Sequence, residues 1–226
     1  MPPTARLLTR GGLFALIWML GAAVWATPTM DFVPPAAGSY KLERIQQATE
    51  GAVLDANGTR RRLSEFAQGR ITLLAFMYSS CADPNGCPYA LTVMHLVKND
   101  LEKLPQTRGR VRFVSLSFDP LRDTPQVIAL YGRDYSGADR HVAWDFLTTR
   151  SRRELLPILK GFGQDVGVDV DKVSGKPLGT YSHVLKVFLI DRHRMVREIY
   201  TTDYLLPSMV LTDIKTLLIE DGVSLK

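Results

Sequence analysis

The residues best suited to carry chemistry are two cysteines, Cys81 and Cys87, which lie in the segment from Tyr78 to Pro88. Two thiolates on one loop form a soft, negatively charged pair, which can close a reversible disulfide or bind a soft metal ion such as Cu(I). The residues at 84–86, Pro-Asn-Gly, are typical of a turn. We therefore expect the two cysteines to approach the Cα separation of roughly 5.5–6 Å that a disulfide needs.

Two sulfur atoms do not complete a stable metal site in water, so a third ligand must come from elsewhere. The best candidate is His183, at the junction between a polar segment and the apolar run 184–190. A rigid strand could hold its imidazole in place. Two simpler interpretations stay open: a lone histidine is more often a surface or partnered group, and two cysteines in an exported protein can form a structural disulfide. Asp119, followed by Pro120, orients the site or makes a turn.

The elements that must position the cysteines are a strand and a helix. Residues Ile71–Met77 are an uninterrupted apolar run, which predicts a strand covered on both faces. Residues 88–104 carry apolar side chains mostly three or four apart, which predicts an amphipathic helix with Pro88 at its first position. In α/β sheets, ligands bind at the carboxyl ends of strands. At the start of the helix, the helix dipole is expected to lower the pKa of the Cys87 thiol.

The rest of the chain alternates between predicted strands and helices. A hairpin is expected to open the domain at 51–58, with an Asn-Gly turn, and 163–182 is expected to be a long loop rich in Gly and Asp. Further strands are predicted at 111–117, 144–147, 184–190 and 195–200, and helices at 63–66, 124–132, 151–160 and 207–219. This order predicts an α/β fold, with a central mixed sheet flanked by helices and an N-terminal hairpin.

The N-terminal segment resembles a targeting signal. Arg6 and Arg10 precede an apolar run at 13–25, and small residues precede a potential cleavage site after Ala26. The run is shorter than the roughly 20 residues that a membrane span needs. Both a cleaved signal peptide and a retained membrane anchor would export the domain, to a periplasmic or similar oxidising compartment, with an inner-membrane tether through 13–25 in the second case. The chain is thus divided into a signal peptide or membrane anchor at 1–26, a linker at 27–44 and a domain at 45–226.

Composition excludes several classes of protein. Of the 226 residues, 46% are hydrophobic and 23% are charged, which is ordinary for a globular domain and excludes wholesale disorder. The net charge of +5 comes from scattered basic residues, so no nucleic-acid-binding surface is predicted. Two cysteines are too few for a disulfide scaffold or a four-cysteine zinc site.

Taken together, these residues resemble the Sco/SenC family of thioredoxin-like proteins. The resemblance covers roughly residues 45–220, in family order, and implies a thioredoxin-like fold. The segments that carry it are Phe76-Met-Tyr-Ser-Ser-Cys81, Cys87-Pro88, Ser115-Leu-Ser-Phe-Asp119-Pro-Leu-Arg-Asp123-Thr-Pro125, Leu147-Thr148, and Tyr181-Ser-His183 running into Phe188-Leu-Ile-Asp191.

The resemblance also implies copper binding by two cysteines and one histidine, here Cys81, Cys87 and His183. The implied partner is a cytochrome c oxidase subunit, whose CuA centre receives copper or has its cysteines kept reduced, or another copper or thiol protein. The family's cysteines are typically separated by three residues, whereas five intervene here, and a longer loop costs more entropy to fix around a metal.

We therefore expect a metallochaperone rather than an enzyme. Two alternatives follow from the same cysteines. One is a thiol–disulfide oxidoreductase, which would act on the cysteines of a partner protein through a mixed disulfide. The other is a non-catalytic thioredoxin-like module, in which the pair forms a structural disulfide.

Overall fold

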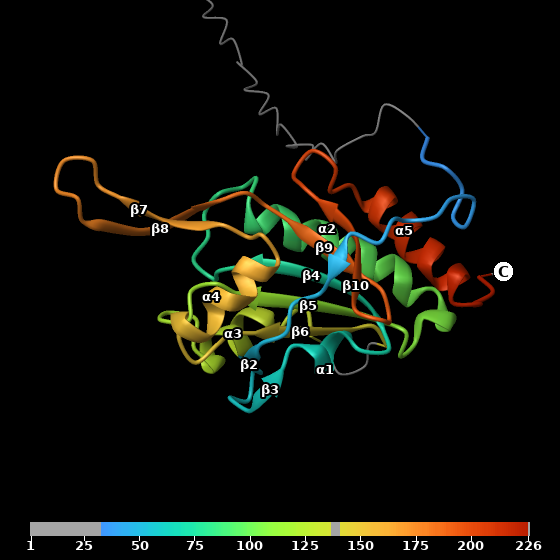
Figure 1. The fold of residues 1–226 in the computed structure, drawn as a ribbon, viewed down its shortest axis with the longest axis horizontal. Coiled ribbons are helices and arrows are strands. Elements are labelled where there is room, and N and C mark those ends of the chain that lie inside the picture. The colour runs from blue at the N-terminus through green and yellow to red at the C-terminus, as the bar shows by residue number, and fades with distance from the viewer. Residues whose placement is uncertain (1–32, 137–140, 226) are drawn as a thin grey trace, which may run out of the picture.

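The protein is built on one six-stranded mixed sheet, seen in a computed structural model that describes residues 33–136 and 141–225 (Figure 1). The three strands β4, β5 and β6 are parallel, and the other three continue the sheet in antiparallel pairs. In spatial order the strands are β1 (Gln46–Gln47), β10 (Met195–Tyr200), β9 (Val187–Ile190), β4 (Ile71–Met77), β5 (Val111–Ser117) and β6 (Ala143–Leu147). The predicted central mixed sheet is confirmed.

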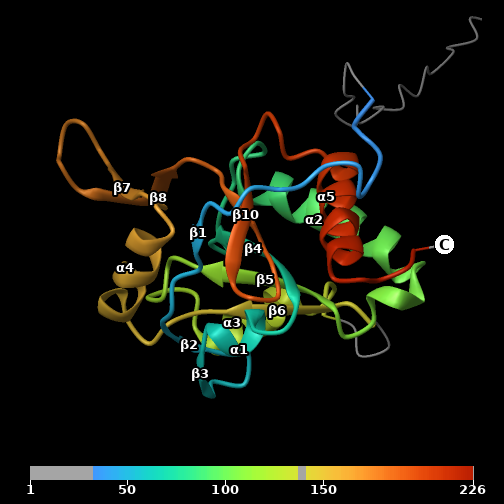
Figure 2. The same ribbon diagram turned by 45° about the vertical axis from the view of Figure 1, so that its right-hand side comes forward.

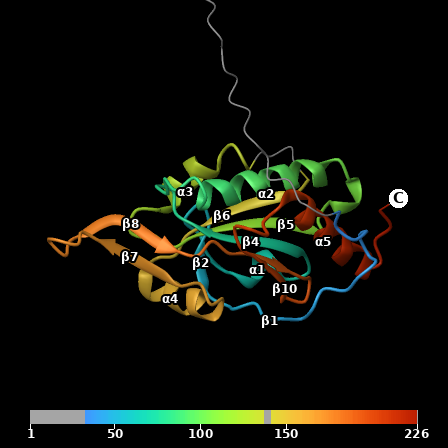
Figure 3. The same cartoon turned by 90° about the horizontal axis from the view of Figure 1, so that it is seen from above.

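Helices cover both faces of this sheet (Figure 3). On one face lie α2 (Cys87–Glu102), α3 (Pro125–Gly132) and α5 (Pro207–Glu220), and on the other lie α1 (Ser64–Ala67) and α4 (Arg152–Gly161). Strand β4 serves both cores: Leu73 and Ala75 join the first, while Leu74 and Phe76 join the second. Because alternate side chains of a strand point to opposite faces, this double burial explains why its sequence is apolar at every position but Thr72.

Most of the predicted elements are confirmed, with small changes at their ends. The N-terminal hairpin is present as β2 (Ala52–Leu54) and β3 (Arg60–Arg62), which pair in antiparallel fashion. Pro157 lies inside α4 and does not end it, and Ser151 caps this helix by accepting a hydrogen bond from the backbone N–H of Glu154. The two-residue strand β1 was not predicted.

The prediction of a long loop at 163–182 is wrong. This segment forms a second hairpin, made of β7 (Val166–Val170) and β8 (Pro177–His183), which projects from the body of the molecule (Figure 1). The β-branched valines of β7 favour a strand. The Asp171 side chain accepts hydrogen bonds from the backbone N–H groups of Val173 and Ser174, and so builds the turn. His183 consequently ends a strand, and β9 begins at Val187 rather than at 184.

The predicted signal peptide or membrane anchor at 1–26 lies outside the described residues. Within the part of the chain that the structure describes, no helix is long and apolar enough to cross a membrane. The described end of the predicted linker packs along α5 (Figure 2). There the Tyr40 hydroxyl donates to the Asp213 carboxylate, and the backbone N–H of Gly38 donates to the Thr216 hydroxyl at 3.0 Å.

Candidate metal-binding site

Cys81 and Cys87 lie on either side of a tight turn between β4 and α2. Cys87 is the first residue of α2 and Gly86 is its N-cap, so the helix begins one residue before the predicted start at Pro88. The turn is closed by Asp83, whose carbonyl accepts from the N–H of Gly86 and whose side chain accepts from the N–H of Asn85, both at 3.0 Å. This Asp-centred turn accommodates the five residues between the cysteines, because it folds the chain back on itself.

The structure brings His183 to Cys87 from a distant part of the chain. The Sγ atom of Cys87 lies 4.0 Å from Nε2 of His183. A metal ion with bonds of about 2.3 Å to sulfur and about 2.0 Å to nitrogen would hold these atoms roughly 3.7 Å apart at an angle of 120°. The two side chains therefore already stand close to the separation that a shared metal ion requires.

Cys81, the third candidate ligand, lies closer to solvent than Cys87 does. Both cysteines are free thiols, and Cys81 is partly exposed while Cys87 is buried. The Cys81 side chain neighbours those of Cys87 and Tyr78 and interacts with both. Within residues 33–136 and 141–225, no three His, Cys, Asp or Glu side chains are arranged so that they could hold a metal ion as they stand. A site with all three ligands therefore needs a movement of the Cys81 loop.

The prediction that the helix dipole lowers the pKa of Cys87 is wrong. The residue is 0% exposed. Burial raises the pKa of the Cys87 thiol, and the hydrogen bond from the backbone N–H of Tyr78 only partly opposes this effect. Desolvation disfavours the charged thiolate more strongly here than the helix start favours it. Of the two thiols, the partly exposed Cys81 is therefore the one that an external reactant meets first.

An aromatic wall separates His183 from solvent on one side. The imidazole packs against Phe118, with ring centroids 4.9 Å apart, and Tyr78 lies at 6.4 Å. Burial lowers the pKa of His183 below its ordinary value of 6.5. The imidazole is accordingly neutral at pH 7, which is the form that binds metal ions.

A buried carboxylate fixes the start of the cysteine loop. Asp123 is 1% exposed, and its carboxylate accepts hydrogen bonds from the backbone N–H of Ser79 at 3.0 Å and from the hydroxyls of Ser79 and Ser117. Sequence reasoning gave Asp123 no role of its own. Its place in the segment after β5 was the available signal, because that edge of the sheet meets the cysteine loop.

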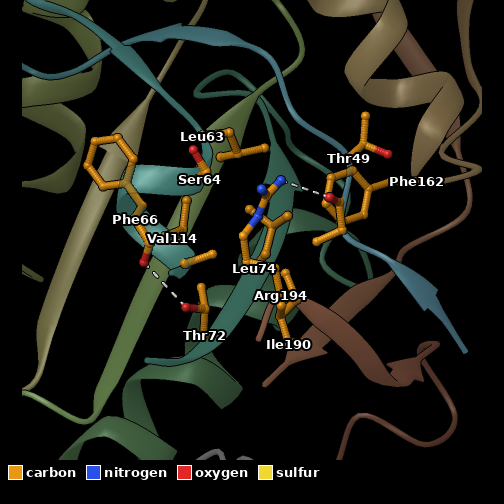
Figure 4. A pocket seen from close by; sticks show the side chains of 12 residues that line it. Thr49, Leu63, Ser64, Phe66, Thr72, Leu74, Val114, Phe162, Ile190 and Arg194 are labelled. Carbon is orange, nitrogen blue, oxygen red and sulfur yellow. Dashed lines mark hydrogen bonds between the residues drawn. The ribbon is translucent and has the colours of Figure 1, made fainter. Parts of the chain in front are cut away.

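Two cavities among the described residues lie away from the two cysteines. One void, with a volume of about 10 Å³, lies under α1 and is lined by apolar side chains such as Phe66, Leu74 and Phe162 and by Arg194 (Figure 4). Such a volume holds one water molecule at most. A larger groove of about 440 Å³ follows the edge of β6 and includes neither cysteine.

Burial of Cys87 predicts a pH dependence of stability in the reduced protein. Because the folded-state pKa is raised above the ordinary 9.0, the folded state keeps a proton that the unfolded state loses as pH rises. The stabilisation is present below pH 9 and decreases above it, by about 0.8 kcal/mol at pH 9.5 relative to pH 7.5. Urea unfolding of the wild type and of Cys87→Ser at both pH values measures the difference. An equal loss in both proteins would contradict the prediction.

Comparison with known proteins adds a family match. The SCO1/SenC family model matches residues 45–218. A curated relative, the SCO2-like protein RP587 of Rickettsia prowazekii, is 29% identical over 103 residues, which are 45% of this chain. The chain matches about half of that relative's length, 47%.

Solved structures show the same fold. Copper-bound ScoI from Arabidopsis thaliana is 17% identical, with a TM-score of 0.63, and the match covers 77% of this chain and 99% of that one. Apo Sco1 from Thermus thermophilus is 25% identical, with a TM-score of 0.62, over 80% of this chain and 98% of that one. The predicted thioredoxin-like architecture is therefore confirmed.

Proposed function

Because the chain belongs to the SCO1/SenC family, we propose that it is an exported copper-binding metallochaperone that holds copper through Cys81, Cys87 and His183. The observation that carries the proposal is the 4.0 Å separation between Cys87 Sγ and His183 Nε2, two groups 96 residues apart in the chain. The plant relative named above holds copper in its structure, which supports copper as the cargo of this chain.

The chemistry of the donor set suits Cu(I). Thiolate sulfurs and a neutral imidazole are soft to intermediate ligands, which Cu(I) prefers over carboxylates and water. Binding must displace the proton of the buried Cys87 thiol, so copper affinity is expected to rise with pH. Movement of the partly exposed Cys81 then closes the site from the solvent side.

The proposed partner is a cytochrome c oxidase subunit or another copper or thiol protein. The solved protein BsSco is described as having a disulfide switch and as a member of the Sco family of cytochrome c oxidase assembly proteins. A SCO1/SenC family lipoprotein is known from Bacillus anthracis, which supports an exported, membrane-associated setting for this chain. Copper would pass by exchange of Cys81, Cys87 and His183 for ligands of the partner.

A second candidate function uses the same cysteines as a redox pair, and the unequal exposure of the two thiols favours it. The Cys81 thiolate would attack a disulfide of the partner and form a mixed disulfide, releasing one partner thiolate. The Cys87 thiolate would then attack Cys81, release the second partner thiolate and leave a Cys81–Cys87 disulfide. The partner is reduced and this protein is oxidised by two electrons. The structural-disulfide alternative predicts a loss of thermal stability when the cysteines are reduced.

Anaerobic titration of the reduced full-length protein with Cu(I), against a colorimetric Cu(I) chelator, tests the proposal. We expect one tightly bound Cu(I) per chain, and X-ray absorption should show two sulfur ligands and one nitrogen ligand. Absence of stoichiometric binding would overturn the metallochaperone. Trapping of a partner by the Cys87→Ser variant, without copper binding, would instead establish the oxidoreductase.

A further inference from the structure

The strand that carries His183 has to be held in place, because its hairpin extends away from the body (Figures 1 and 3). An isolated two-stranded hairpin is marginally stable in water. At its base, the Gln164 side chain donates to the carbonyl of Val184 at 2.9 Å and Lys186 donates to the carbonyl of Gly163 at 2.6 Å. These contacts secure the backbone on either side of the hairpin.

A group of three side chains ties β8 to the loop between β5 and α3. The guanidinium carbon of Arg122 lies 5.4 Å from the centre of the Tyr181 ring, and the same guanidinium donates to the Asp119 carboxylate. The Tyr181 hydroxyl also lies near the Asp119 carboxylate, close enough for the two groups to interact. We call Asp119, Arg122 and Tyr181 the latch. The Asp119 side chain is 2% exposed and is therefore fixed in the core, whereas the Arg122 side chain is 44% exposed.

The shape of β8 is adapted to this contact. A Cβ atom on Gly179 would lie 3.2 Å from Nη1 of Arg122, so the absence of a side chain there lets the guanidinium reach the strand. Tyr181 and His183 are two residues apart and therefore point to the same face of β8. A contact that holds the Tyr181 ring against the body of the molecule therefore also holds the imidazole of His183 in place.

The contacts continue from the latch to the metal ligand. The ring of Tyr181 packs against Phe118 with centroids 5.6 Å apart, and Phe118 packs against His183 at 4.9 Å. On the inner side of His183 lies Cys87, which is fully buried. A sulfur atom with no exposed surface cannot exchange a metal ion with another protein until something moves away from it.

We propose that Arg122 is a positioning residue of the metal site: through Asp119 and Tyr181 it holds β8 against the body, keeps His183 beside Cys87 and shields the Cys87 thiol from solvent. Opening of the latch lets the hairpin swing about its base and exposes Cys87. The part that concerns copper rests on the proposed function, whereas the shielding of Cys87 belongs to the metal-free protein.

Alkylation of the metal-free protein tests the shielding directly. In a Cys81→Ser background Cys87 is the remaining cysteine, so its rate of reaction with iodoacetamide reports how often the site opens. At a temperature well below the thermal midpoint of the variant, where global unfolding is too rare to contribute, Arg122→Ala should raise this rate about tenfold. Arg122→Lys should give a smaller increase, because lysine keeps the charge opposite Asp119 but loses the planar stacking on Tyr181. Arg133→Ala, which removes an arginine 72% exposed beside Asp134, is the matched control and should change nothing.

Two further measurements separate the latch from a general loss of stability. Tyr181→Phe should reduce the effect of adding Arg122→Ala, since the two changes break the same network. With both cysteines present, Arg122→Ala should weaken Cu(I) binding about tenfold and lower the nitrogen contribution to the X-ray absorption spectrum, without abolishing it. An unchanged alkylation rate, or an equal increase in Arg133→Ala, overturns the latch. Faster alkylation in a protein whose wild type binds no copper keeps the latch and rejects the metallochaperone.

Discussion

In anaerobic titrations, His183→Ala should bind Cu(I) more than about a hundredfold more weakly than the wild type. Loss of an outer partner of a metal ligand costs roughly 10–100-fold in affinity, and loss of a ligand itself should exceed that. Without the imidazole, two thiolates remain, and solvent or an external thiol must fill the third position. Competition with a chelator of known affinity measures the change.

Serine variants of the cysteines should produce an effect at least as large. Serine keeps nearly the volume of cysteine but offers a hard hydroxyl oxygen, which is a poor ligand for Cu(I). For Cys87→Ser the fold should survive, because the substituted position lies at the start of α2 and the helix keeps Pro88 at its first turn. The same titration, with circular dichroism to check folding, provides the measurement.

An exposed histidine provides the matched control for these titrations. His193→Ala removes an imidazole in the turn between β9 and β10 and should leave the affinity unchanged. If His183→Ala bound Cu(I) as tightly as the wild type, the third ligand would be another group. If the serine variants did so, the cysteines would have no part in copper binding, and only a redox or structural role would be left for them.

The parts of the fold that the sequence predicted are those with a strong hydrophobic pattern. Strand β4 lies between two cores, so every residue except Thr72 is apolar, and its predicted bounds agree with the structure. The β7–β8 hairpin was missed because it packs little of its surface: glycine, aspartate and serine interrupt its pattern, and the residues resemble a loop. A structureless loop of twenty residues in a compact domain was itself an improbable element.

The candidate site, like the fold, could be predicted only in part from the sequence. Cys81, Cys87 and His183 could be selected by residue type, because few other side chains bind soft metals. The direction of the pKa shift at Cys87 could not be predicted from residue type, because it depends on how completely β8 and the aromatic side chains around His183 exclude water. Asp123 was overlooked for a related reason: its three hydrogen bonds join residues that meet only after the sheet has formed.

Replacing Asp123 by alanine should destabilise the protein by about 3 kcal/mol, because it leaves the buried N–H of Ser79 and the hydroxyls of Ser79 and Ser117 without their acceptor. For a domain of this size, that corresponds to a decrease in thermal midpoint of roughly 6–12 °C. The cysteine loop begins at Ser79, so the loss should also loosen the position of Cys81. Thermal unfolding followed by circular dichroism measures the first effect, and hydrogen exchange of the loop amides measures the second.

The conservative variant and a surface control make this result specific. Asp123→Asn keeps the shape and one acceptor oxygen but places an NH₂ group against donors, so it should lose part of the stability. Asp134→Ala removes a carboxylate whose side chain is 86% exposed and should shift the midpoint very little. An Asp123→Ala protein that melted with the wild type would show that water replaces the carboxylate, and the cysteine loop would then be held by its own Asp83 turn and the start of α2.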